Sequence, residues 1–447
     1  MNIGIVGAGC SGSLVAIHLL QHPGNVSVHL VEPRRDLARG LAYSTTCPDH
    51  LLNVPAASMS AFPAHPAHFC EWLNFNGYPE VGPEFFAPRL VYGRYLESQL
   101  QVAVESKPGS FHRHVTGACD LRCEFGGGIR LLLRDGTSLV VDRAVLAVGN
   151  PPPVSAAVRG LAAANGQYFS SVWEEGALDL PATYPVLLIG SGLTAVDAVI
   201  ALRSRGHRGT IYMVSRHGQV PHGHVPGQTG CVQNCIQDDV PAYLPLGAMV
   251  RTLRTAAKCA PEWRMVIDRL RPYSDQIWSR FTAAEKRRFR RHLKSYWDVH
   301  RHRMAPRIAT ELFRAQQQGE LEIVAGRLRQ AEVSGRCLVV EIALRGGGER
   351  IIPVGRIINC TAPNCDYRRV ANPIVQSLFR QALASPGESG VGLRTNAHGA
   401  LIDAAGRPSD RLFTVGPPRA GDLFESIAVP EIRVQAEALA AYLVTGR

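Results

Sequence analysis

Residues 2–13 read Asn2-Ile-Gly-Ile-Val-Gly-Ala-Gly-Cys-Ser-Gly-Ser13, an apolar run of strand type that passes directly into a glycine-rich turn. Gly7, Gly9 and Gly12 have the spacing Gly-x-Gly-x-x-Gly, which allows a tight turn, a close approach of backbone N–H groups to a pyrophosphate, and close helix packing. Ser11 lies inside this turn. The run therefore predicts the first strand and phosphate-binding turn of a dinucleotide-binding fold.

The residues after the turn complete a βαβ unit. Ser13 to Gln21 has helical character, Val26 to Val31 reads as a strand, and Glu32 follows it, 20 residues after Gly12. A carboxylate at this position accepts hydrogen bonds from the hydroxyl groups of an adenosine ribose. The order of strand, turn, helix and carboxylate favours this interpretation over the alternative of a glycine-rich turn beside a surface glutamate.

A second unit of the same kind begins at residue 186. The sequence Val186-Leu-Leu-Ile-Gly-Ser-Gly-Leu-Thr-Ala195 places Gly190, Gly192 and Ala195 where the first unit has its three glycines. Two such units in one chain predict an α/β protein with two Rossmann-like dinucleotide-binding domains.

The second strand of this second unit, Thr210–Ser215, is followed by Arg216 and not by a carboxylate. No negative charge repels a 2′-phosphate there, and the guanidinium can contact it, so NADP is favoured over NAD. We therefore expect Ser215 and Arg216 to contact the nicotinamide cofactor. An exposed loop arginine is the alternative interpretation of Arg216.

Helical periodicity dominates from Leu246 to Gln318. Thr282-Ala-Ala-Glu285 has the form of a capping box, and apolar residues then recur at intervals of three to four from Phe289 to Met304. A strand is expected near Leu338–Ala343, and a last helix over Pro430–Val444. These patterns predict a helical insertion between strands of the second unit.

The chain has 48 Lys and Arg residues against 37 Asp and Glu residues, a net charge of +11. This surplus suits a phosphate-bearing ligand, a nucleic acid or an acidic substrate. In the basic run Lys286–Arg291 the apolar residues mark one buried face, which is typical of a solvated helix, and we expect no nucleic-acid partner. No apolar run reaches the roughly 18 residues of a membrane span, and no signal peptide is recognisable. We expect a cytoplasmic protein without a membrane partner.

The 11 cysteines form no Cys-x-x-Cys pair, so a disulfide-reductase mechanism is disfavoured. His217, His222 and His224 precede Cys231 and Cys235, but the spacing of a zinc ribbon is not met. We expect no metal site, and we interpret this segment as a loop that folds over the nicotinamide cofactor.

Further motifs lie outside the two glycine turns. They are Arg39-Gly-Leu-Ala-Tyr-Ser44, His50-Leu-Leu-Asn-Val-Pro55 with Met59-Ser60, Phe86-Ala-Pro-Arg89 with Tyr92-Gly-Arg-Tyr95, Val214-Ser-Arg-His-Gly218, and Leu412-Phe-Thr-Val-Gly416 with Glu425 and Pro430-Glu431. Together they resemble the FAD/NAD(P)-binding family of flavoproteins with two dinucleotide-binding domains. That family includes the nitrosuccinate-forming aspartate N-monooxygenases and is distantly similar to ornithine and lysine N-hydroxylases.

The resemblance implies positions around a flavin for six residues. Gly40, Asn53 and Ser60 are expected near the isoalloxazine, Arg89 near the flavin–nicotinamide cleft, and Gly416 and Glu425 at the far edge of the flavin. Apart from these six, Gly149 is also expected to contact a cofactor. The last helix would direct its positive end at the pyrimidine ring. A merely loop-fixing role is the alternative for Asn53 and Arg89.

The resemblance also divides the chain. We expect an FAD-binding domain over residues 1–160, an NADPH-binding domain over 161–245, a helical insertion over 246–320, a second part of the NADPH-binding domain over 321–360, and the C-terminal part of the FAD-binding domain over 361–447.

The activity implied is that of a single-component monooxygenase of N-hydroxylase type, which uses FAD, NADPH and O₂ through a C4a-(hydro)peroxyflavin. The expected substrate is a small amine, an amino acid or an acidic metabolite, and Arg301, Arg303 or Arg307 is a candidate to hold an acidic group. No catalytic residue is identified. The alternatives are an NADPH-dependent flavin reductase without oxygen insertion and a flavin-binding redox sensor. Baeyer–Villiger chemistry is disfavoured, because Tyr168-Phe-Ser-Ser-Val-Trp-Glu174 lacks the Phe-x-Gly-x-x-x-His signature.

Overall fold

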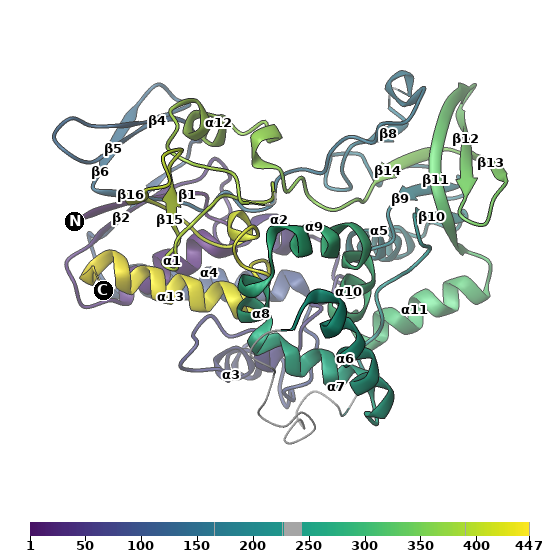
Figure 1. Cartoon of the computed structure of the whole chain (residues 1–447), viewed down its shortest axis with the longest axis horizontal. Helices are drawn as coiled ribbons and strands as arrows, with labels where there is room; N and C mark the ends of the chain where they lie inside the picture. The colour runs from purple at the N-terminus through teal and green to yellow at the C-terminus, as the bar shows by residue number, and fades with distance from the viewer. Residues whose placement is uncertain (165, 226, 228–243, 389, 447) are drawn as a thin grey trace.

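The computed structural model describes residues 1–164, 166–225, 227, 244–388 and 390–446. Two α/β lobes lie side by side, and a group of helices covers their junction on the side facing the viewer in Figure 1. The first lobe is built on a six-stranded sheet and the second on a seven-stranded sheet. The predicted class, an α/β protein with two Rossmann-like units and a helical insertion, is confirmed.

The sheet of the first lobe is parallel except at one edge. Its strand order is β15 (Ala400–Ile402), β16 (Pro408–Thr414), β7 (Arg143–Leu146), β1 (Asn2–Val6), β2 (Ser27–Val31) and β3 (Phe111–His114), and only β15 pairs antiparallel to its neighbour. Segments from both ends of the chain therefore share one sheet, so the C-terminal residues belong to the first lobe.

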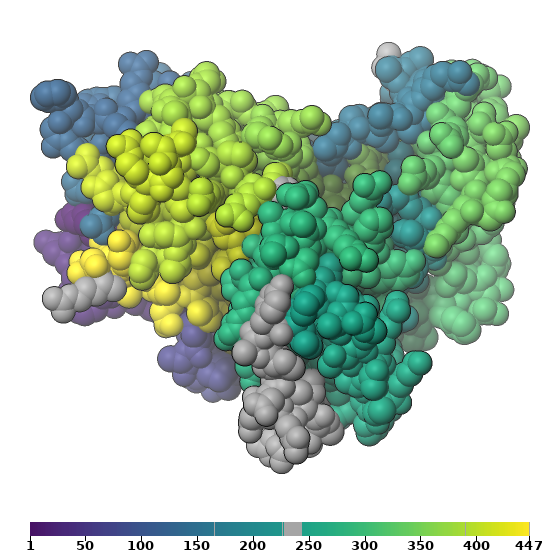
Figure 2. Space-filling model, viewed as in Figure 1, coloured from purple at the N-terminus to yellow at the C-terminus, as the bar shows by residue number. Residues whose placement is uncertain are grey.

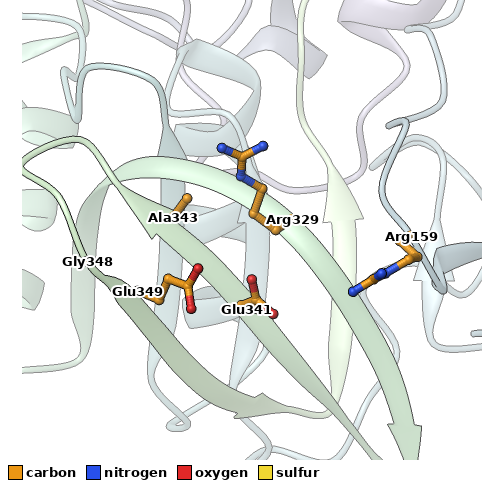
Figure 3. Close-up of a pocket in the computed structure, with 6 residues that line it drawn as sticks. All are labelled: Arg159, Arg329, Glu341, Ala343, Gly348 and Glu349. Carbon is orange, nitrogen blue, oxygen red and sulfur yellow. The ribbon is translucent and has the colours of Figure 1, made fainter.

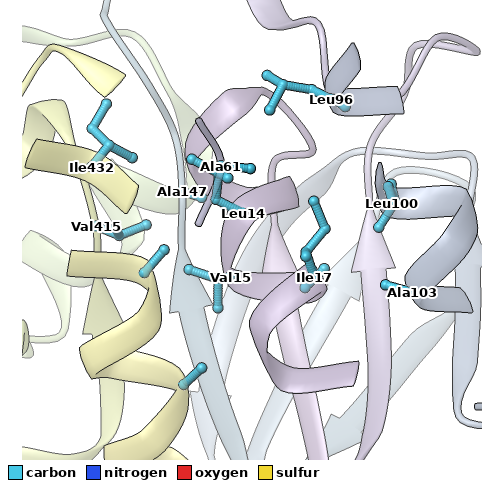
Figure 4. Packing of buried hydrophobic residues seen from close by; sticks show 14 of the residues in the cluster. Leu14, Val15, Ile17, Ala61, Leu96, Leu100, Ala103, Ala147, Val415 and Ile432 are labelled. Atoms are coloured by element: carbon cyan, nitrogen blue, oxygen red, sulfur yellow. The ribbon is translucent and has the colours of Figure 1, made fainter. Parts of the chain in front are cut away.

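Helices cover one face of this sheet and a small sheet covers the other. The helical face carries α1 (Cys10–Gln21), α3 (His68–Phe75), α4 (Arg89–Ser106) and α13 (Val429–Thr445), and the short helix α2 (Gly40–Tyr43) contacts α4. Figure 4 shows the packing of α1 against α4 and α13, with Leu14, Ile17 and Leu100 among the buried side chains. The opposite face carries α12 (Pro373–Arg380) and the antiparallel strands β4 (Ala118–Cys123), β5 (Ile129–Leu133) and β6 (Ser138–Val141).

The sheet of the second lobe has a parallel part and a hairpin part. Its order is β13 (Glu349–Val354), β12 (Cys337–Leu344), β11 (Leu321–Ser334), β10 (Ile211–Ser215), β9 (Val186–Ile189), β14 (Arg356–Asn359) and β8 (Tyr168–Phe169). On one face its core includes residues of α5 (Leu193–Ser204) and α11 (Pro306–Gln317). The long strand β11 continues past β10 and pairs with β12, a feature that the sequence patterns did not predict.

The remaining helices form the insertion. They are α6 (Leu246–Cys259), α7 (Trp263–Leu270), α8 (Ser274–Arg280), α9 (Ala283–His292) and α10 (Lys294–Arg301). The capping box is confirmed, because the Thr282 and Glu285 side chains each accept a hydrogen bond from the other residue's backbone N–H. The apolar spacing from Phe289 to Met304 runs across two helices: α9 ends at His292, α10 begins at Lys294, and Met304 pairs with Gly223. Within the described part of the chain, no helix is long and apolar enough to cross a membrane.

Candidate functional site: two glycine turns on one cavity

The first glycine turn leaves no room for side chains. Gly7 has φ +98°, and a Cβ atom there would lie 2.4 Å from the carbonyl oxygen of Ala147. A Cβ atom on Gly12 would lie 1.9 Å from the carbonyl oxygen of Gly7. Because α1 begins at Cys10, its free N–H groups and positive end point out of this turn. The turn has the form needed to hold a pyrophosphate.

Glu32 stands at the end of β2, beside the turn. Its side chain accepts hydrogen bonds from the Ala8 backbone N–H at 2.9 Å and from Arg34 Nε at 2.8 Å. Burial opposes ionisation, but these hydrogen bonds hold the pKa of Glu32 below its usual range. An ionised carboxylate therefore lies where a ribose would need an acceptor.

The second glycine turn repeats this geometry in the second lobe. Gly190 has φ +115°, and a Cβ atom there would lie 2.8 Å from the carbonyl oxygen of Cys360. Ser215 at the end of β10 accepts a hydrogen bond from Ser191 Oγ at 2.8 Å. Ala195 is fully buried in the core of the lobe, so it packs the helix on the sheet and does not contact a ligand.

Positive charge gathers just after β10, where Arg216 follows that strand, Arg327 comes from β11 and Arg345 follows β12. Arg216 is exposed, and Arg345 Nη1 lies 2.7 Å from His217 Nδ1. Burial, Arg345, Arg216 and Arg327 together lower the pKa of His217, which means that the three guanidinium groups share its surroundings. Sequence reasoning found Arg216 but missed Arg327 and Arg345, since both lie more than a hundred residues further along the chain.

Both turns open into one cavity of about 1570 Å³ between the lobes. On the molecular surface, Figure 2 shows a notch where the two lobes meet above the insertion helices. The cavity brings together thirteen of the predicted site residues: Gly7, Gly9, Ser11, Glu32, Gly40, Asn53, Arg89, Gly149, Gly190, Gly192, Ser215, Arg216 and Glu425.

Four of the predicted site residues do not line the cavity: Gly12, Ser60, Ala195 and Gly416. Ser60 is fully buried, and its hydroxyl donates to the carbonyl oxygens of Phe62 and His65. Gly416 packs beside Ser11, because a Cβ atom on it would lie 2.6 Å from Ser11 Oγ. These residues lie behind the lining of the cavity and support it.

A smaller pocket of about 560 Å³ lies on the second sheet. Figure 3 shows its lining of Arg159, Arg329, Glu341, Ala343, Gly348 and Glu349. It contains none of the residues predicted from the sequence, and both glycine turns lie outside it.

Arg89 joins the two lobes at the floor of the cavity. Its Nη1 atom lies 2.5 Å from Oδ2 of Asp197 on α5, and its Nε donates to the carbonyl oxygen of Leu51 at 3.0 Å. His50 adds a contact of 2.9 Å between Nε2 and the backbone oxygen of Asp197. Asp197 and His50 were not among the predicted site residues, because nothing in the sequence pairs them with Arg89.

The insertion holds the loop that leads into α13. Asp275 accepts hydrogen bonds from the backbone N–H groups of Phe424 and Glu425, at 2.6 and 3.0 Å. Arg301 Nε donates to Glu425 at 2.9 Å, with both side chains buried. Burial raises the pKa of Glu425, and Arg301 opposes that effect. The loop and the positive end of α13 are thereby fixed at the cavity wall.

The structure does not bring Arg301, Arg303 or Arg307, the candidates to hold an acidic group, to the cavity. Each of these arginines is paired with a carboxylate of the chain itself, Glu425, Asp268 and Asp49 respectively, and none of them is among the residues that line it. The cations that the insertion does present to the cavity are Arg290 and Lys294.

Neither a metal cluster nor a disulfide is found in the described ranges. No group of three or more His, Cys, Asp or Glu residues there is arranged to hold a metal ion, and the described cysteines are free. His224 instead lies 3.1 Å from the backbone oxygen of Asn53. Cys231 and Cys235, considered above as ligands, lie outside the described residues.

Comparison with known families assigns the first third of the chain. Residues 4–151 match the model of a family described as FAD-NAD(P)-binding. This part of the chain is therefore similar to FAD-NAD(P)-binding proteins. The predicted family resemblance is confirmed, and the expected cofactors, FAD and a nicotinamide dinucleotide, are those of the family description.

One curated relative matches part of this chain. It is YdhS, an uncharacterized protein of Escherichia coli (strain K12), which is 26% identical over 218 residues. The matched stretch spans 45% of this chain and 39% of the relative, so the chain covers well under half of that protein.

Solved structures share the fold over nearly the whole chain. The ornithine N-hydroxylase KtzI of Kutzneria sp. 744, described with reduced FAD, NADP⁺ and L-ornithine, has a TM-score of 0.66 at 12% identity and covers 99% of this chain and 98% of its own. L-lysine 6-monooxygenase from Pseudomonas syringae has a TM-score of 0.67 at 15% identity, and the match covers 99% of this chain and 98% of that enzyme. Thioredoxin reductase of Lactococcus lactis has a TM-score of 0.56 at 10% identity, and the match covers 99% of this chain and 97% of that enzyme.

Proposed function

We propose that this protein is an FAD-dependent, NADPH-using oxidoreductase, and that it acts as a single-component monooxygenase of N-hydroxylase type on a small amine or amino acid. The observation that carries the proposal is the single cavity into which both glycine turns open. Two dinucleotides held at these turns would share one space, as hydride transfer between them requires.

The first site fits FAD through groups that are already in place. Gly7 and Gly9 let the turn fold closely against the backbone of Ala147 and Gly40, and the N-terminal end of α1 would stabilise the charge of a pyrophosphate there. The Glu32 carboxylate would accept a hydrogen bond from the ribose after Arg34 Nε releases its own hydrogen bond to this group. The positive end of α13, which begins at Val429, stands at the cavity wall to stabilise negative charge on the flavin.

The second site fits NADPH better than NADH. Gly190 and Gly192 line the cavity at the second turn and would hold the pyrophosphate of NADPH there. Arg216 and Arg327 line the cavity where the 2′-phosphate would lie. Arg345 stands behind them through its contact with His217. Because the nearby His217 pKa is lowered, this histidine is neutral near pH 7 and the arginines supply the charge.

FAD, when bound, would supply the redox chemistry. The residues of the chain bind and orient the reactants around it. Arg89 and Asp197 hold the two lobes in register, and Glu425 and Asp275 fix the wall nearest α13. No acid–base pair of the protein is required for the cofactor to be reduced.

The test is an assay of the full chain reconstituted with FAD. NADPH consumption is measured against a panel of amines and amino acids, and products are analysed by mass. The proposal expects one substrate class to gain a single oxygen atom while the yield of hydrogen peroxide per NADPH falls. Peroxide equal to the NADPH consumed, with every compound left unchanged, would contradict oxygen insertion.

A second candidate is an NADPH-dependent reductase without oxygen insertion. The fold shared with thioredoxin reductase favours it. The absence of a Cys-x-x-Cys pair from the sequence argues against a dithiol route, and the electrons would then pass to an external acceptor. The same assay with a quinone or dye in place of the amines distinguishes this candidate.

A further inference from the structure

One wall of the cavity comes from the insertion. Phe289, Arg290, Lys294, Ser295, Trp297, Asp298 and His302 line it. If the two turns hold the two dinucleotides, this wall is left to face a substrate. Its chemistry is therefore informative about the substrate class.

Lys294 and Asp298 place opposite charges on this wall. They lie one helical turn apart on α10, with Lys294 Nζ 2.5 Å from Asp298 Oδ2. Their side chains are 50% and 36% exposed. A pair of this kind in contact with solvent binds weakly, so each group can exchange its partner for a group on a ligand.

A neighbouring histidine lies beside the pair but carries no charge near pH 7. His302 lies 3.9 Å from Asp298, but burial, Arg301 and Lys294 lower the pKa of His302 to about 3, so it is neutral near pH 7 and does not compensate the carboxylate. Trp297 beside them is anchored on Phe424, with ring centres 5.5 Å apart. The helix that carries the two charges is thus held firmly at the cavity.

Residues of the C-terminal segment, among them Cys365 and Asn372, line the same cavity as Lys294 and Asp298. A small ligand held in this cavity beside α10 would meet a cation and an anion together.

We propose that Lys294 and Asp298 select a zwitterionic substrate, with Lys294 binding the α-carboxylate and Asp298 the α-ammonium of an amino acid. This inference rests on the proposed function, since it concerns the substrate of the same cavity. It assigns specificity to a pair on the insertion, while the dinucleotide contacts come from the two lobes. Simple amines and simple acids satisfy one partner only and bind more weakly.

The probes are L-ornithine and two compounds that each lack one of its α-groups. Butane-1,4-diamine lacks the carboxylate, and 5-aminopentanoate lacks the α-ammonium; L-aspartate serves as a second amino acid. The Kd of each is measured by equilibrium dialysis with the full chain loaded with FAD. For the wild-type protein we expect at least one of the two amino acids to bind, and L-ornithine to bind about tenfold tighter than either truncated compound.

The two variants should lose different compounds. In Lys294→Ala the binding of L-ornithine and 5-aminopentanoate should weaken about tenfold, and the binding of butane-1,4-diamine should be unchanged. In Asp298→Asn the binding of L-ornithine and butane-1,4-diamine should weaken, and the binding of 5-aminopentanoate should be unchanged. Lys294→Arg should restore binding. Arg291→Ala is the matched control, because Arg291 is an exposed cation next to α10 that does not line the cavity.

An L-ornithine Kd that is unchanged in both variants overturns the proposal, and so does the failure of both amino acids to bind the wild-type protein. Product analysis reports separately on the proposed function. Binding that depends on Lys294 and Asp298 without any oxygenated product would leave the pair's role standing and refute monooxygenation. Oxygenated product with binding independent of the pair would do the reverse.

Discussion

The guanidinium of Arg89 lies 2.5 Å from the carboxylate of Asp197, and this ion pair joins the two lobes where both border the cavity. The two side chains are only 13% and 12% exposed. Each residue comes from a different lobe, so the distance between the two glycine turns depends on a contact that spans 108 positions of the sequence. Both side chains line the candidate site, and their contact also fixes the position of one lobe relative to the other.

Removing one partner of this pair should destabilise the protein. Arg89→Ala leaves the Asp197 carboxylate largely buried without its cation, and we expect a loss of about 3 kcal/mol in the free energy of unfolding. Urea unfolding followed by circular dichroism measures it. The control is Arg205→Ala, whose pair with Asp179 is 51% and 71% exposed and should matter by less than about 1 kcal/mol. Equal losses in the two variants would show that Arg89 is no more than a surface charge.

Gly7→Ala should abolish flavin binding. The added Cβ atom would meet the Ala147 carbonyl oxygen at 2.4 Å, and backbone cannot move aside as a flexible side chain can. The control Gly136→Ala separates this clash from backbone strain, because Gly136 also has positive φ, +85°, with nothing within 4 Å of an added Cβ atom. We expect Gly136→Ala to cost about 1 kcal/mol and to keep its flavin. Flavin content per chain after reconstitution is the measurement, and a fully flavinated Gly7→Ala protein would refute the first site.

Arg216→Ala and Arg327→Ala should each raise the KM for NADPH by about tenfold and leave the KM for NADH nearly unchanged. The reason is that only NADPH carries the 2′-phosphate that these guanidinium groups would contact. Arg329→Ala serves as the control, since Arg329 belongs to the smaller pocket on the same strand. If both cofactors respond equally, the cationic cluster does not recognise that phosphate.

Stability should fall on acidification below about pH 6.5. Burial is the leading cause that lowers the pKa of His18, His29 and His224 to about 4 in the folded protein. Between pH 6.5 and 4 the unfolded chain therefore binds more protons than the folded one, so protons favour unfolding. For His18, which is 8% exposed, the stability lost by pH 4 is at most about 3 kcal/mol.

The measurement for this effect is the free energy of unfolding from pH 7.5 to 4. His18→Phe removes one titrating group and keeps a ring against Phe62, whose centre lies 5.9 Å from that of His18. The slope of the free energy of unfolding against pH should be smaller in the variant, by an amount that corresponds to the uptake of up to one proton fewer on unfolding. An identical slope in the two proteins would mean that His18 keeps an ordinary pKa.

Much of the fold was predictable because its signals are local. Gly7 and Gly190 require positive φ and close backbone contact, the helices α1 and α5 start directly after their turns, and Glu32 ends a strand. The capping box at Thr282 marked the start of α9 as expected. The end of α9 at His292 has no comparable signal in the sequence, because the spacing of apolar residues continues from α9 into α10.

The site was predictable only in part. Thirteen proposed residues border the cavity, but the roles of the charged residues depended on their partners. Arg301 was proposed as a substrate contact and instead pairs with Glu425, 124 positions away in the sequence. A sequence shows that a cation is present, and only the folded chain shows whether a carboxylate already neutralises it.

The amino-acid sequence by itself determined the two nucleotide-binding turns, because a missing Cβ atom and a strand–turn–helix order are requirements that a dozen consecutive residues can meet alone. Tertiary structure decided that the turns face one cavity, that Arg327 and Arg345 join Arg216, and that Lys294 and Asp298 meet the remaining space. These relations arise when lobes and insertion pack together. Electrostatic and packing energies depend on distances between residues that lie far apart in the chain, and those distances exist only after folding.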